Sequence, residues 1–486
     1  MADSKATLLR VYVVSLGCPK NMVDSERLMA AIKALGFRPT VDPKQADLLV
    51  INTCAFIRTA TEEAIFNILR LAEIKKPGAK LAVMGCLVSR YGDEMSEALT
   101  EADLAVPPNG YPEFLDKLCA WYGLADKPRG DGPKKAKASP LGLDGEQRTV
   151  KASALPAALP SPSPSAGFLV IPAAFQGPFE TWHRDQGTPF WRSWLKIAEG
   201  CDNRCSYCLI PSIRGPLKLR PMEDLVLEAE KLAQAGVKEL TLVAQDLTAW
   251  SDGDKDLSDL VRQLSDISTL VWIRLMYAYP ERLKLKLVEA LASIPKLVPY
   301  LDVPVQHSSP KILKSMGRVA KNPLDLINKL RKWWPGVALR TTLMVGFPGE
   351  TDEDYDTLAR FVESAVFEHV GVFKFSPEEG AKASSFPNQV PPMVSERRRR
   401  NLMSRQRKIS LALNKARVGQ SKLVLVEGAS PDTDLIMTGR ADFQAPEVDG
   451  VVYFDGYQPQ PGQMVMAKFL KATAYDLSAA VESESF

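Results

Sequence analysis

Short apolar runs alternate with amphipathic segments over residues 8–124. The pattern predicts buried strands in LRVYVVSLG, ADLLVINTC and AKLAVMGC, which are rich in β-branched and aliphatic residues. It predicts helices in SERLMAAIKALGF, IRTATEEAIFNILRLAEIKK and SEALTEA. Strands that alternate with helices form parallel sheets with helical crossovers. We therefore expect an amino-terminal parallel α/β domain over residues 8–124.

The pattern breaks down over residues 125–186. This stretch contains KPRGDGPKKAKASPLGLDGEQ and ALPAALPSPSPSAG, which are rich in Pro, Ala, Ser and Lys and have little periodicity. Such a composition is typical of a linker or a loosely ordered insertion. We expect it to separate two folded regions.

A second alternating series fills residues 187–417. Six apolar runs are separated by amphipathic segments, and they read SWLKIAEG, KELTLVAQD, VWIRLMYAYP, VPYLDVPVQHSS, ALRTTLMVGFPGE and HVGVFKFSPEEG. Six strands with intervening helices fall short of the eight of a closed β/α barrel, so the pattern predicts a partial barrel. A basic helix follows in SERRRRNLMSRQRKISLALN, with Ser395 as its expected cap and a solvated charged face at 397–400.

Residues 418–486 carry a different pattern. The runs KLVLVEG, DLIMTGR, GVVYFDG and QMVMAKFLKATAYDL predict strands, and Gly, Pro and Asp turns separate them. Strands of this length and number predict a small all-β barrel.

Composition narrows the class of protein. The chain has 486 residues and 45% hydrophobic residues, with a formal net charge of only +3, so no strong global field draws it to nucleic acid or to a membrane. The first residues lack the features of a signal peptide, and no apolar run is long enough to span a bilayer, so we expect a cytoplasmic protein. Seven cysteines in such a chain indicate thiolate chemistry rather than a disulfide framework.

Three of the cysteines form a tight cluster after the first predicted barrel strand. Cys201, Cys205 and Cys208 lie in EGCDNRCSYCLIPSIRG with the spacing C-x3-C-x2-C. An iron-sulfur cube normally takes four thiolates, so three leave one iron open to a small chelating ligand. The alternative is a zinc site with three cysteines that His307 or another distant residue completes.

Three further cysteines end predicted strands of the first domain. Cys18, Cys54 and Cys86 close VYVVSLGC, LLVINTC and LAVMGC. Parallel strands bring their carboxyl ends to one edge of the sheet, so these thiols are expected to converge, and the small neighbours Gly17, Thr53 and Gly85 leave room for a cluster. The pattern predicts a second 4Fe-4S cluster with one open iron, and the alternative is three buried core cysteines.

With its partial barrel, the C-x3-C-x2-C loop resembles the radical S-adenosylmethionine superfamily. Both cysteine sets together, over nearly the whole chain outside the linker, resemble the methylthiotransferases. The resemblance implies a radical barrel over 187–417 and a TRAM domain over 418–486. It also implies two 4Fe-4S clusters, one S-adenosylmethionine that supplies a methyl group and a second that supplies a radical, an external sulfur source and an electron-donor protein.

Two branches of that family compete, one that modifies an adenosine of transfer RNA and one that modifies an aspartate in the twelfth protein of the small ribosomal subunit. The second is favoured by SLGCPKNMVDSE, VINTCAFIRTATEEAI, LVAQDLTAW and FKFSPEEGAKAS. The transfer RNA branch usually has Cys-Gln-Met-Asn in place of CPKN. The resemblance therefore implies a ribosomal protein, free or on the ribosome, as substrate, with RNA contact secondary and no membrane partner. A non-catalytic iron-sulfur carrier is the alternative from another class.

Further candidate residues follow the predicted barrel strands, at the carboxyl rim where such folds bind ligands. The resemblance implies that Gln245 and Asp246 contact the methionine amino group and that Gly346 and Gly349 admit the adenosine. Arg340 is a candidate for the cofactor carboxylate, or else a salt-bridged strand residue. Gln306 and His307 are candidates for cofactor or substrate, His307 with a structural role as its alternative. Tyr207 offers an aromatic face beside the cysteine loop.

Overall fold

The computed structural model describes residues 8–108, 110–124, 184–187, 189–318 and 322–485. The chain forms two compact units. The first comprises the described residues of Met1–Thr188 with Leu209–Pro216 and Glu378–Gly380, and the second comprises those of Pro189–Cys208, Leu217–Pro377 and Ala381–Phe486. The predicted linker lies outside the described residues except for 184–186. The predicted domain boundaries therefore stay predictions.

A five-stranded sheet with all neighbours parallel organises the first unit, which confirms the predicted α/β domain. Its strand order is β2-β1-β3-β4-β5, so the direction of chain progression reverses between β1 and β3. Sheets of this kind bind ligands at the carboxyl ends of the strands beside such a point. The strands are β1 (Arg10–Ser15), β2 (Arg38–Pro39), β3 (Leu48–Thr53), β4 (Lys80–Gly85) and β5 (Leu104–Val106).

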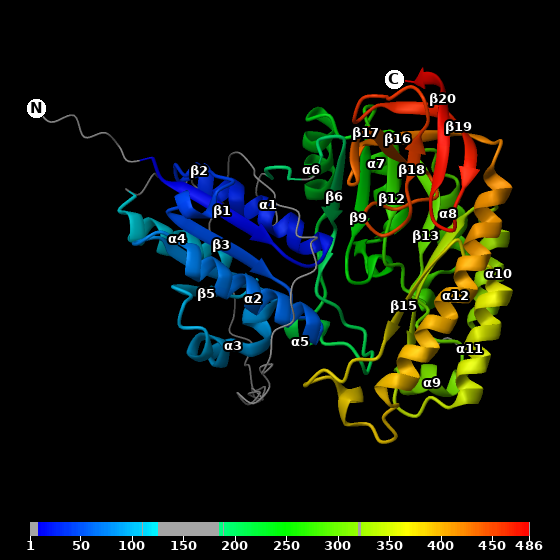
Figure 1. Cartoon of the computed structure of the whole chain (residues 1–486), viewed down its shortest axis with the longest axis horizontal. Coiled ribbons are helices and arrows are strands. Elements are labelled where there is room, and N and C mark those ends of the chain that lie inside the picture. Colours follow the sequence, from blue (N-terminus) through cyan, green and yellow to red (C-terminus); the bar gives the residue numbers. More distant parts are fainter. Residues whose placement is uncertain (1–7, 109, 125–183, 188, 319–321, 486) are drawn as a thin grey trace, which may run out of the picture. The chain divides into compact units, whose positions relative to one another are not determined.

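Helices cover this sheet (Figure 1). One face shares an apolar core with α1 (Pro19–Ala34) and α4 (Tyr111–Tyr122), to which Val13, Leu28 and Phe114 contribute. The other helices of the unit are α2 (Arg58–Ile74), α3 (Cys86–Ala98) and the short α5 (Ile210–Arg214). The prediction placed the start of α1 too late and recovered only the end of α3, because polar residues near the cysteines masked the helical period.

The second unit contains six parallel strands, and its sheet is open rather than closed, which confirms the predicted partial barrel. The strand order is β15-β14-β13-β12-β9-β6. These strands are β6 (Arg192–Lys196), β9 (Glu239–Val243), β12 (Trp272–Leu275), β13 (Leu297–Asp302), β14 (Ala338–Val345) and β15 (His369–Lys374). Short two-stranded sheets join β7 (Ala198–Glu199) to β8 (Lys218–Leu219) and β10 (Ser251–Asp252) to β11 (Lys255–Asp256).

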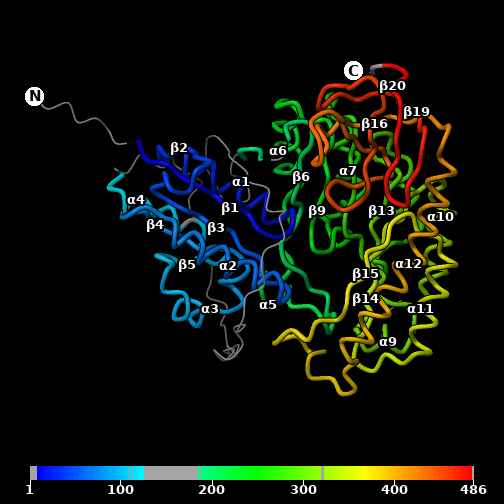
Figure 2. Tube along the Cα trace, in the orientation of Figure 1, coloured from blue at the N-terminus to red at the C-terminus, as the bar shows by residue number. Residues whose placement is uncertain are grey.

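Amphipathic helices pack around these six strands and bury the apolar core of the unit. Figure 2 shows the last of them, α12, running beside β15 and α11. Its first turn follows Pro391, so the predicted Ser395 cap is wrong, and Ser395 instead lies buried inside the helix. The helices are α6 (Met222–Gln234), α7 (Leu257–Ser265), α8 (Leu285–Ala292), α9 (Pro310–Ser315), α10 (Pro323–Trp333), α11 (Asp352–Ala365) and α12 (Pro392–Arg417).

A closed five-stranded barrel ends the chain, as predicted, in the order β16-β17-β18-β20-β19. The pattern predicted four strands in this region, and the additional strand, β20, contains the acidic residue Glu482. The strands are β16 (Ser421–Ser430), β17 (Thr433–Ala441), β18 (Val452–Phe454), β19 (Met464–Ala472) and β20 (Leu477–Ser485). Among the helices in the described parts of the chain, none is long and apolar enough to cross a membrane.

Candidate functional site

The amino-terminal cysteines lie at the carboxyl ends of three neighbouring strands, as predicted. Cys18 follows β1 and precedes α1, Cys54 directly follows β3, and Cys86 is the first residue of α3 after β4. A Cβ atom on Gly17 would lie 2.6 Å from Cys54 Cβ, so only glycine lets the Cys18 and Cys54 segments approach this closely. The sheet therefore gathers the three thiols at the point where the strand order reverses.

The electrostatics of these thiols suit a cationic centre. Burial, with a smaller contribution from the neighbouring thiols of Cys18 and Cys86, raises the pKa of the Cys54 thiol to about 12, although the Phe56 amide and Arg214 act against this. Three such thiols become thiolate ligands together only when positive charge compensates them, as an iron-sulfur cluster does. The donor set therefore fits the predicted cluster.

A polar network surrounds this thiol set, and the sequence analysis did not find it. Asn21 Nδ2 donates to the carbonyls of Leu16 and Thr53, at 2.9 Å in both cases, and so ties together the segments that lead to Cys18 and Cys54. Arg214 Nε donates to Cys86 Sγ over 3.2 Å. The residues lie far apart in the sequence, so no local pattern marks their contact.

The second cysteine set lies in the loop between β7 and α5. Cys201 is buried, and Cys205 and Cys208 are partly buried. Burial raises the pKa of the Cys201 thiol, and the charges of Asp246 and Cys205 add to the effect. This donor set also needs compensating positive charge, and it fits a cluster for the same reason as the first.

Backbone and side-chain contacts fix the shape of this loop. Ser206 donates through its amide to Met316 O at 3.0 Å and through its hydroxyl to Ser315 O at 2.8 Å. Asn203 Nδ2 donates to Asp246 Oδ2 at 2.8 Å. The loop that carries the three thiols is therefore held before any ligand binds.

The structure places Gln245 and Asp246 directly after β9, as predicted. The fully buried Asp246 carboxylate also pairs with Arg282 at 3.0 Å, so its visible role is to anchor the cysteine loop. Gln245 Nε2 donates to Glu199 at 2.8 Å, while its buried Oε1 has no hydrogen-bond partner among the described residues. An acceptor of this kind fits an ammonium group, so Gln245 is the better candidate for the methionine amino group.

Tyr207 is partly buried beside Arg318, an arginine that the sequence analysis did not identify. Burial raises the pKa of Tyr207, and the nearby Arg318 guanidinium acts in the opposite direction. Arg318 stacks over the ring of Tyr279 at 4.4 Å, and the Tyr279 hydroxyl lies 4.0 Å from Cys205 Sγ. The loop, through Tyr207 and Cys205, therefore packs against Arg318 and Tyr279.

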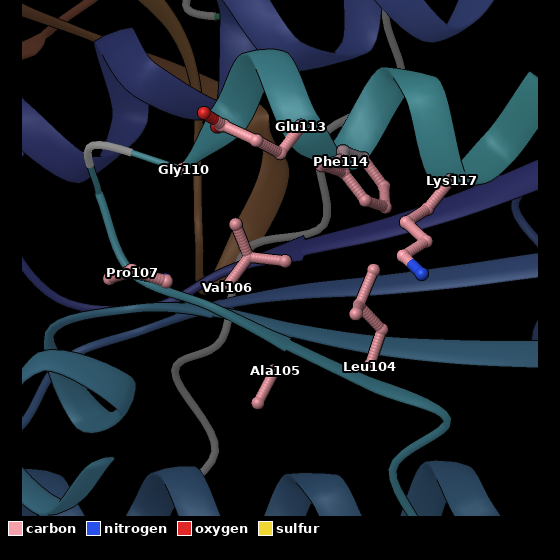
Figure 3. Close-up of a pocket in the computed structure, with 8 residues that line it drawn as sticks. All are labelled: Leu104, Ala105, Val106, Pro107, Gly110, Glu113, Phe114 and Lys117. Atoms are coloured by element: carbon pink, nitrogen blue, oxygen red, sulfur yellow. The ribbon is translucent and has the colours of Figure 1, made fainter.

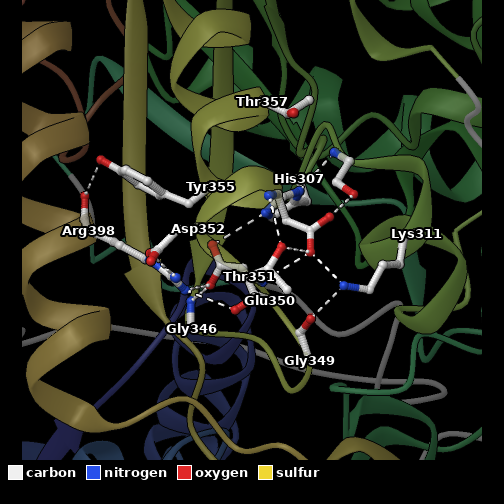
Figure 4. A network of polar contacts seen from close by, with 12 residues as sticks. His307, Lys311, Gly346, Gly349, Glu350, Thr351, Asp352, Tyr355, Thr357 and Arg398 are labelled. Carbon is white, nitrogen blue, oxygen red and sulfur yellow. Dashed lines mark hydrogen bonds and ion pairs between the residues drawn. The ribbon is translucent and has the colours of Figure 1, made fainter.

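His307 belongs to a buried network (Figure 4). Its Nδ1 accepts from the Ser309 amide at 2.9 Å, and its Nε2 lies 3.5 Å from the fully buried Glu350 carboxylate. Glu350 in turn pairs with Arg398 at 3.1 Å. Because both ring nitrogens face neighbours, these contacts favour the structural role for His307 and argue against it as a zinc ligand. Arg398 was expected on a solvated face, but it is buried because it pairs with the buried Glu350 carboxylate.

Gly346 also serves packing rather than a ligand. A Cβ atom there would lie 2.1 Å from Ser395 Oγ of α12, and the residue has a φ of +74°. By contrast, the position of Gly349 has no heavy atom within 4 Å of an added Cβ. The open space at Gly349 is compatible with the predicted adenosine contact, which stays a prediction, whereas packing against Ser395 already accounts for a glycine at position 346.

The structure bears differently on the last two rim candidates, Arg340 and Gln306. Arg340 is near the amino end of β14 and pairs with Asp302 at 4.0 Å and with Asp449 at 3.5 Å, which supports its alternative as a salt-bridged strand residue. It lies at the wrong end of its strand for the rim. Gln306 follows β13 with a φ of 72°, a strained conformation for a residue with a side chain. Such strain occurs at ligand sites, so Gln306 remains a candidate.

Two surface pockets lie outside this set of residues. One, of about 310 Å³, is lined by β5 and α4 residues that include Val106 and Phe114 (Figure 3). The other, of about 380 Å³, lies between α11 and α12 and includes Glu363 and Arg405.

In the described parts of the chain, no three His, Cys, Asp or Glu side chains are spaced to hold a single metal ion. A four-iron cube is larger than one ion, so this finding concerns mononuclear sites only.

Comparisons with known proteins agree with this architecture. Residues 10–107 match "Uncharacterized protein family UPF0004", residues 195–362 match "Radical SAM superfamily", and residues 418–481 match "TRAM domain". The fold is similar to that of a radical S-adenosylmethionine methyltransferase, TsrM, from Kitasatospora setae, with a TM-score of 0.50 at 15% identity over 76% of this chain and 75% of that one.

Curated relatives match over nearly the whole length. The ribosomal protein uS12 methylthiotransferase RimO of Trichlorobacter lovleyi is 40% identical over 98% of this chain and 98% of its own length. RimO of Myxococcus xanthus is 39% identical over 97% of this chain and 91% of its own length. With these identities over nearly the full length, and with the radical SAM and TRAM matches, the chain belongs to the RimO family of radical SAM methylthiotransferases.

Proposed function

We propose that this protein inserts a methylthio group at the β-carbon of an aspartate in ribosomal protein uS12. Such a C–H bond is not acidic at neutral pH, so acid-base catalysis does not break it. A 4Fe-4S cluster with bound S-adenosylmethionine would supply the radical chemistry that breaks this bond. The observation that carries the proposal is the presence of two thiol sets, since radical formation alone needs only one.

Each thiol set has a distinct role in this proposal. Cys201, Cys205 and Cys208 hold the cluster that binds S-adenosylmethionine, in a loop that Asp246 and Asn203 keep in place. Gln245 Oε1, buried and without a hydrogen-bond partner among the described residues, accepts from the methionine ammonium.

The amino-terminal set provides the sulfur. Cys18, Cys54 and Cys86 would hold a second cluster, which would supply the methylthio group from sulfur of an external source and the methyl group of one S-adenosylmethionine, while a second S-adenosylmethionine would supply the radical. The three thiols lie close enough for the charges of Cys18 and Cys86 to raise the pKa of Cys54, in addition to the larger effect of burial, which supports this assignment. An electron-donor protein and a cytoplasmic location complete the proposal.

The carboxyl-terminal barrel bears on the choice of substrate. TRAM domains suggest RNA contact, yet this one carries exposed acidic residues at Asp432 and Glu482, which suit a basic ribosomal protein better than RNA. We propose that the barrel contributes to binding uS12, with RNA contact secondary.

Mass spectrometry tests the substrate. Reduced, reconstituted protein is incubated with S-adenosylmethionine, sulfide and either uS12 or transfer RNA, and each product is examined for the mass of a methylthio group. A gain on the uS12 aspartate supports the proposal, and a gain on transfer RNA alone overturns it. A chain with Cys54→Ala is the matched control, which is expected to release 5'-deoxyadenosine without methylthiolating uS12.

A further inference from the structure

A buried arginine contacts the amino-terminal thiol set directly. Arg214 ends the short helix α5, and its side chain is only 2% exposed. Its Nε donates to Cys86 Sγ at 3.2 Å, and its Nη1 pairs with Asp24 at 3.0 Å. In the sequence Arg214 comes shortly after Cys208, yet it belongs to the compact unit that holds Cys86.

The guanidinium is fixed in orientation as well as in place. Its Nη2 donates to Asn21 Oδ1, and the same Asn21 donates to Leu16 O and Thr53 O, both at 2.9 Å. Asn21 and Asp24 are themselves buried. One polar network therefore reaches the backbone before Cys18, the backbone before Cys54 and the sulfur of Cys86.

A cationic donor on a ligand sulfur has a defined physical effect. An ionised N–H donor stabilises a thiolate more than a neutral one does, and burial strengthens the interaction. Reduction adds one negative charge to an iron-sulfur cluster, so a donor that stabilises negative charge on its sulfur ligands raises the reduction potential. Asp24 acts in the opposite direction, because its carboxylate disfavours the added charge.

We propose that Arg214 is a positioning residue of the amino-terminal cluster, which orients the Cys86 thiolate and raises the reduction potential of the cluster. The inference rests on the proposed function, because it requires Cys18, Cys54 and Cys86 to hold that cluster. It makes this site dependent on a segment from the middle of the chain, which follows the other cysteine loop.

The test isolates the amino-terminal cluster in the full-length chain. A parent with Cys201→Ala, Cys205→Ala and Cys208→Ala is reconstituted, its iron and sulfide are measured, and its midpoint potential is determined by a dithionite titration followed by electron paramagnetic resonance. A parent without iron would refute the proposed function itself. If the parent binds iron, the variants described next test the inference.

Four variants of this parent give distinct expectations. Arg214→Gln should lower the ratio of reduced to oxidised cluster at fixed potential about tenfold, which is 59 mV for one electron. Arg214→Lys keeps the charge without the planar donor and should give an intermediate potential. Asp24→Asn should shift the potential in the positive direction. Arg184→Gln removes a buried guanidinium that pairs with Glu26 and should leave the potential unchanged.

The inference is overturned if loaded Arg214→Gln keeps the parent potential, or if the Arg214 and Asp24 variants shift it in the same direction. If Arg214→Gln folds but does not retain iron, it has no potential to measure, and Arg214→Lys becomes the deciding variant. A lysine variant with a lowered potential, or one that folds but also loses iron while Arg184→Gln stays loaded, supports the positioning role. A lysine variant with the parent potential, or unfolding of both Arg214 variants, overturns it in favour of a purely structural ion pair.

Discussion

Replacing Glu239 by glutamine should destabilise the second unit strongly. Glu239 begins β9 and is fully buried, and its carboxylate accepts from Arg274 Nε at 2.7 Å and from Arg440 Nη1 at 3.3 Å. Arg440 lies on β17, so the carboxylate joins the partial barrel to the carboxyl-terminal barrel. Glutamine keeps the shape of the side chain and removes the charge that both guanidinium groups need.

The magnitude follows from the electrostatics of this site. Burial acts to raise the pKa of Glu239, but Arg440 and Arg274 outweigh it and lower the pKa from 4.5 to about 2. At about 1.36 kcal/mol per pKa unit, the pairing favours the charged form by roughly 3 kcal/mol. Removal of one partner from a buried ion pair typically costs about 3–5 kcal/mol, which agrees with this value.

The pH dependence has a definite sign. Because the pKa of Glu239 is lower in the folded state than in the unfolded state, its contribution is complete above pH 4.5 and is lost as the pH falls toward about 2. As the pH falls from 4.5 toward about 2, the difference in the free energy of unfolding between wild type and Glu239→Gln should therefore shrink.

Urea unfolding of the metal-free chain, followed by circular dichroism, measures the free energy of unfolding at pH 7 and at pH 4. Asp325→Asn is the control, because Asp325 pairs with Lys329 on an exposed helix surface and its loss should change stability by less than about 1 kcal/mol. A Glu239→Gln variant as stable as wild type at pH 7 would refute the reasoning.

Three further predictions concern the site and its support. Gly346→Ala should destabilise the folded chain by about 1–3 kcal/mol in thermal melts and more than Gly349→Ala does, since only the first meets a neighbouring atom; equal effects would exclude the clash. Asp246→Asn should weaken iron retention by the second cysteine set about tenfold, measured in a Cys54→Ala background, because Asp246 anchors the loop; unchanged retention would contradict that role. In metal-free protein at pH 8, Cys54 should react with iodoacetamide far more slowly than glutathione does, because burial raises its pKa to about 12; mass mapping checks this, and an equal rate would contradict it.

Much of the fold was predictable because apolar periodicity reports burial, and burial fixes the strands. The positions of Cys18, Cys54 and Cys86 at the strand ends followed from the same pattern, since parallel strands share an edge. Residues that meet only through the fold were not predictable. Arg214 reaches Cys86 across a long sequence separation, and no periodicity marks that contact.

One open prediction and one wrong prediction about arginines have a common cause. For Arg340 the sequence left open a contact to the cofactor carboxylate and a salt-bridged strand residue, and the pairs with Asp302 and Asp449 favour the second. Arg398 was placed on a solvated face with its charged neighbours, although Glu350 draws it inside. A charge in a sequence does not reveal its partner, and the partner determines whether the side chain is buried.

Iron and sulfide content after anaerobic reconstitution tests the central claim most directly. Two three-thiolate sites predict about eight irons per chain in the wild type and about four when Cys18, Cys54 and Cys86 are all changed to alanine. A wild-type chain that binds about four irons, and keeps them all in that triple variant, would contradict the claim and leave the amino-terminal thiols as packing residues.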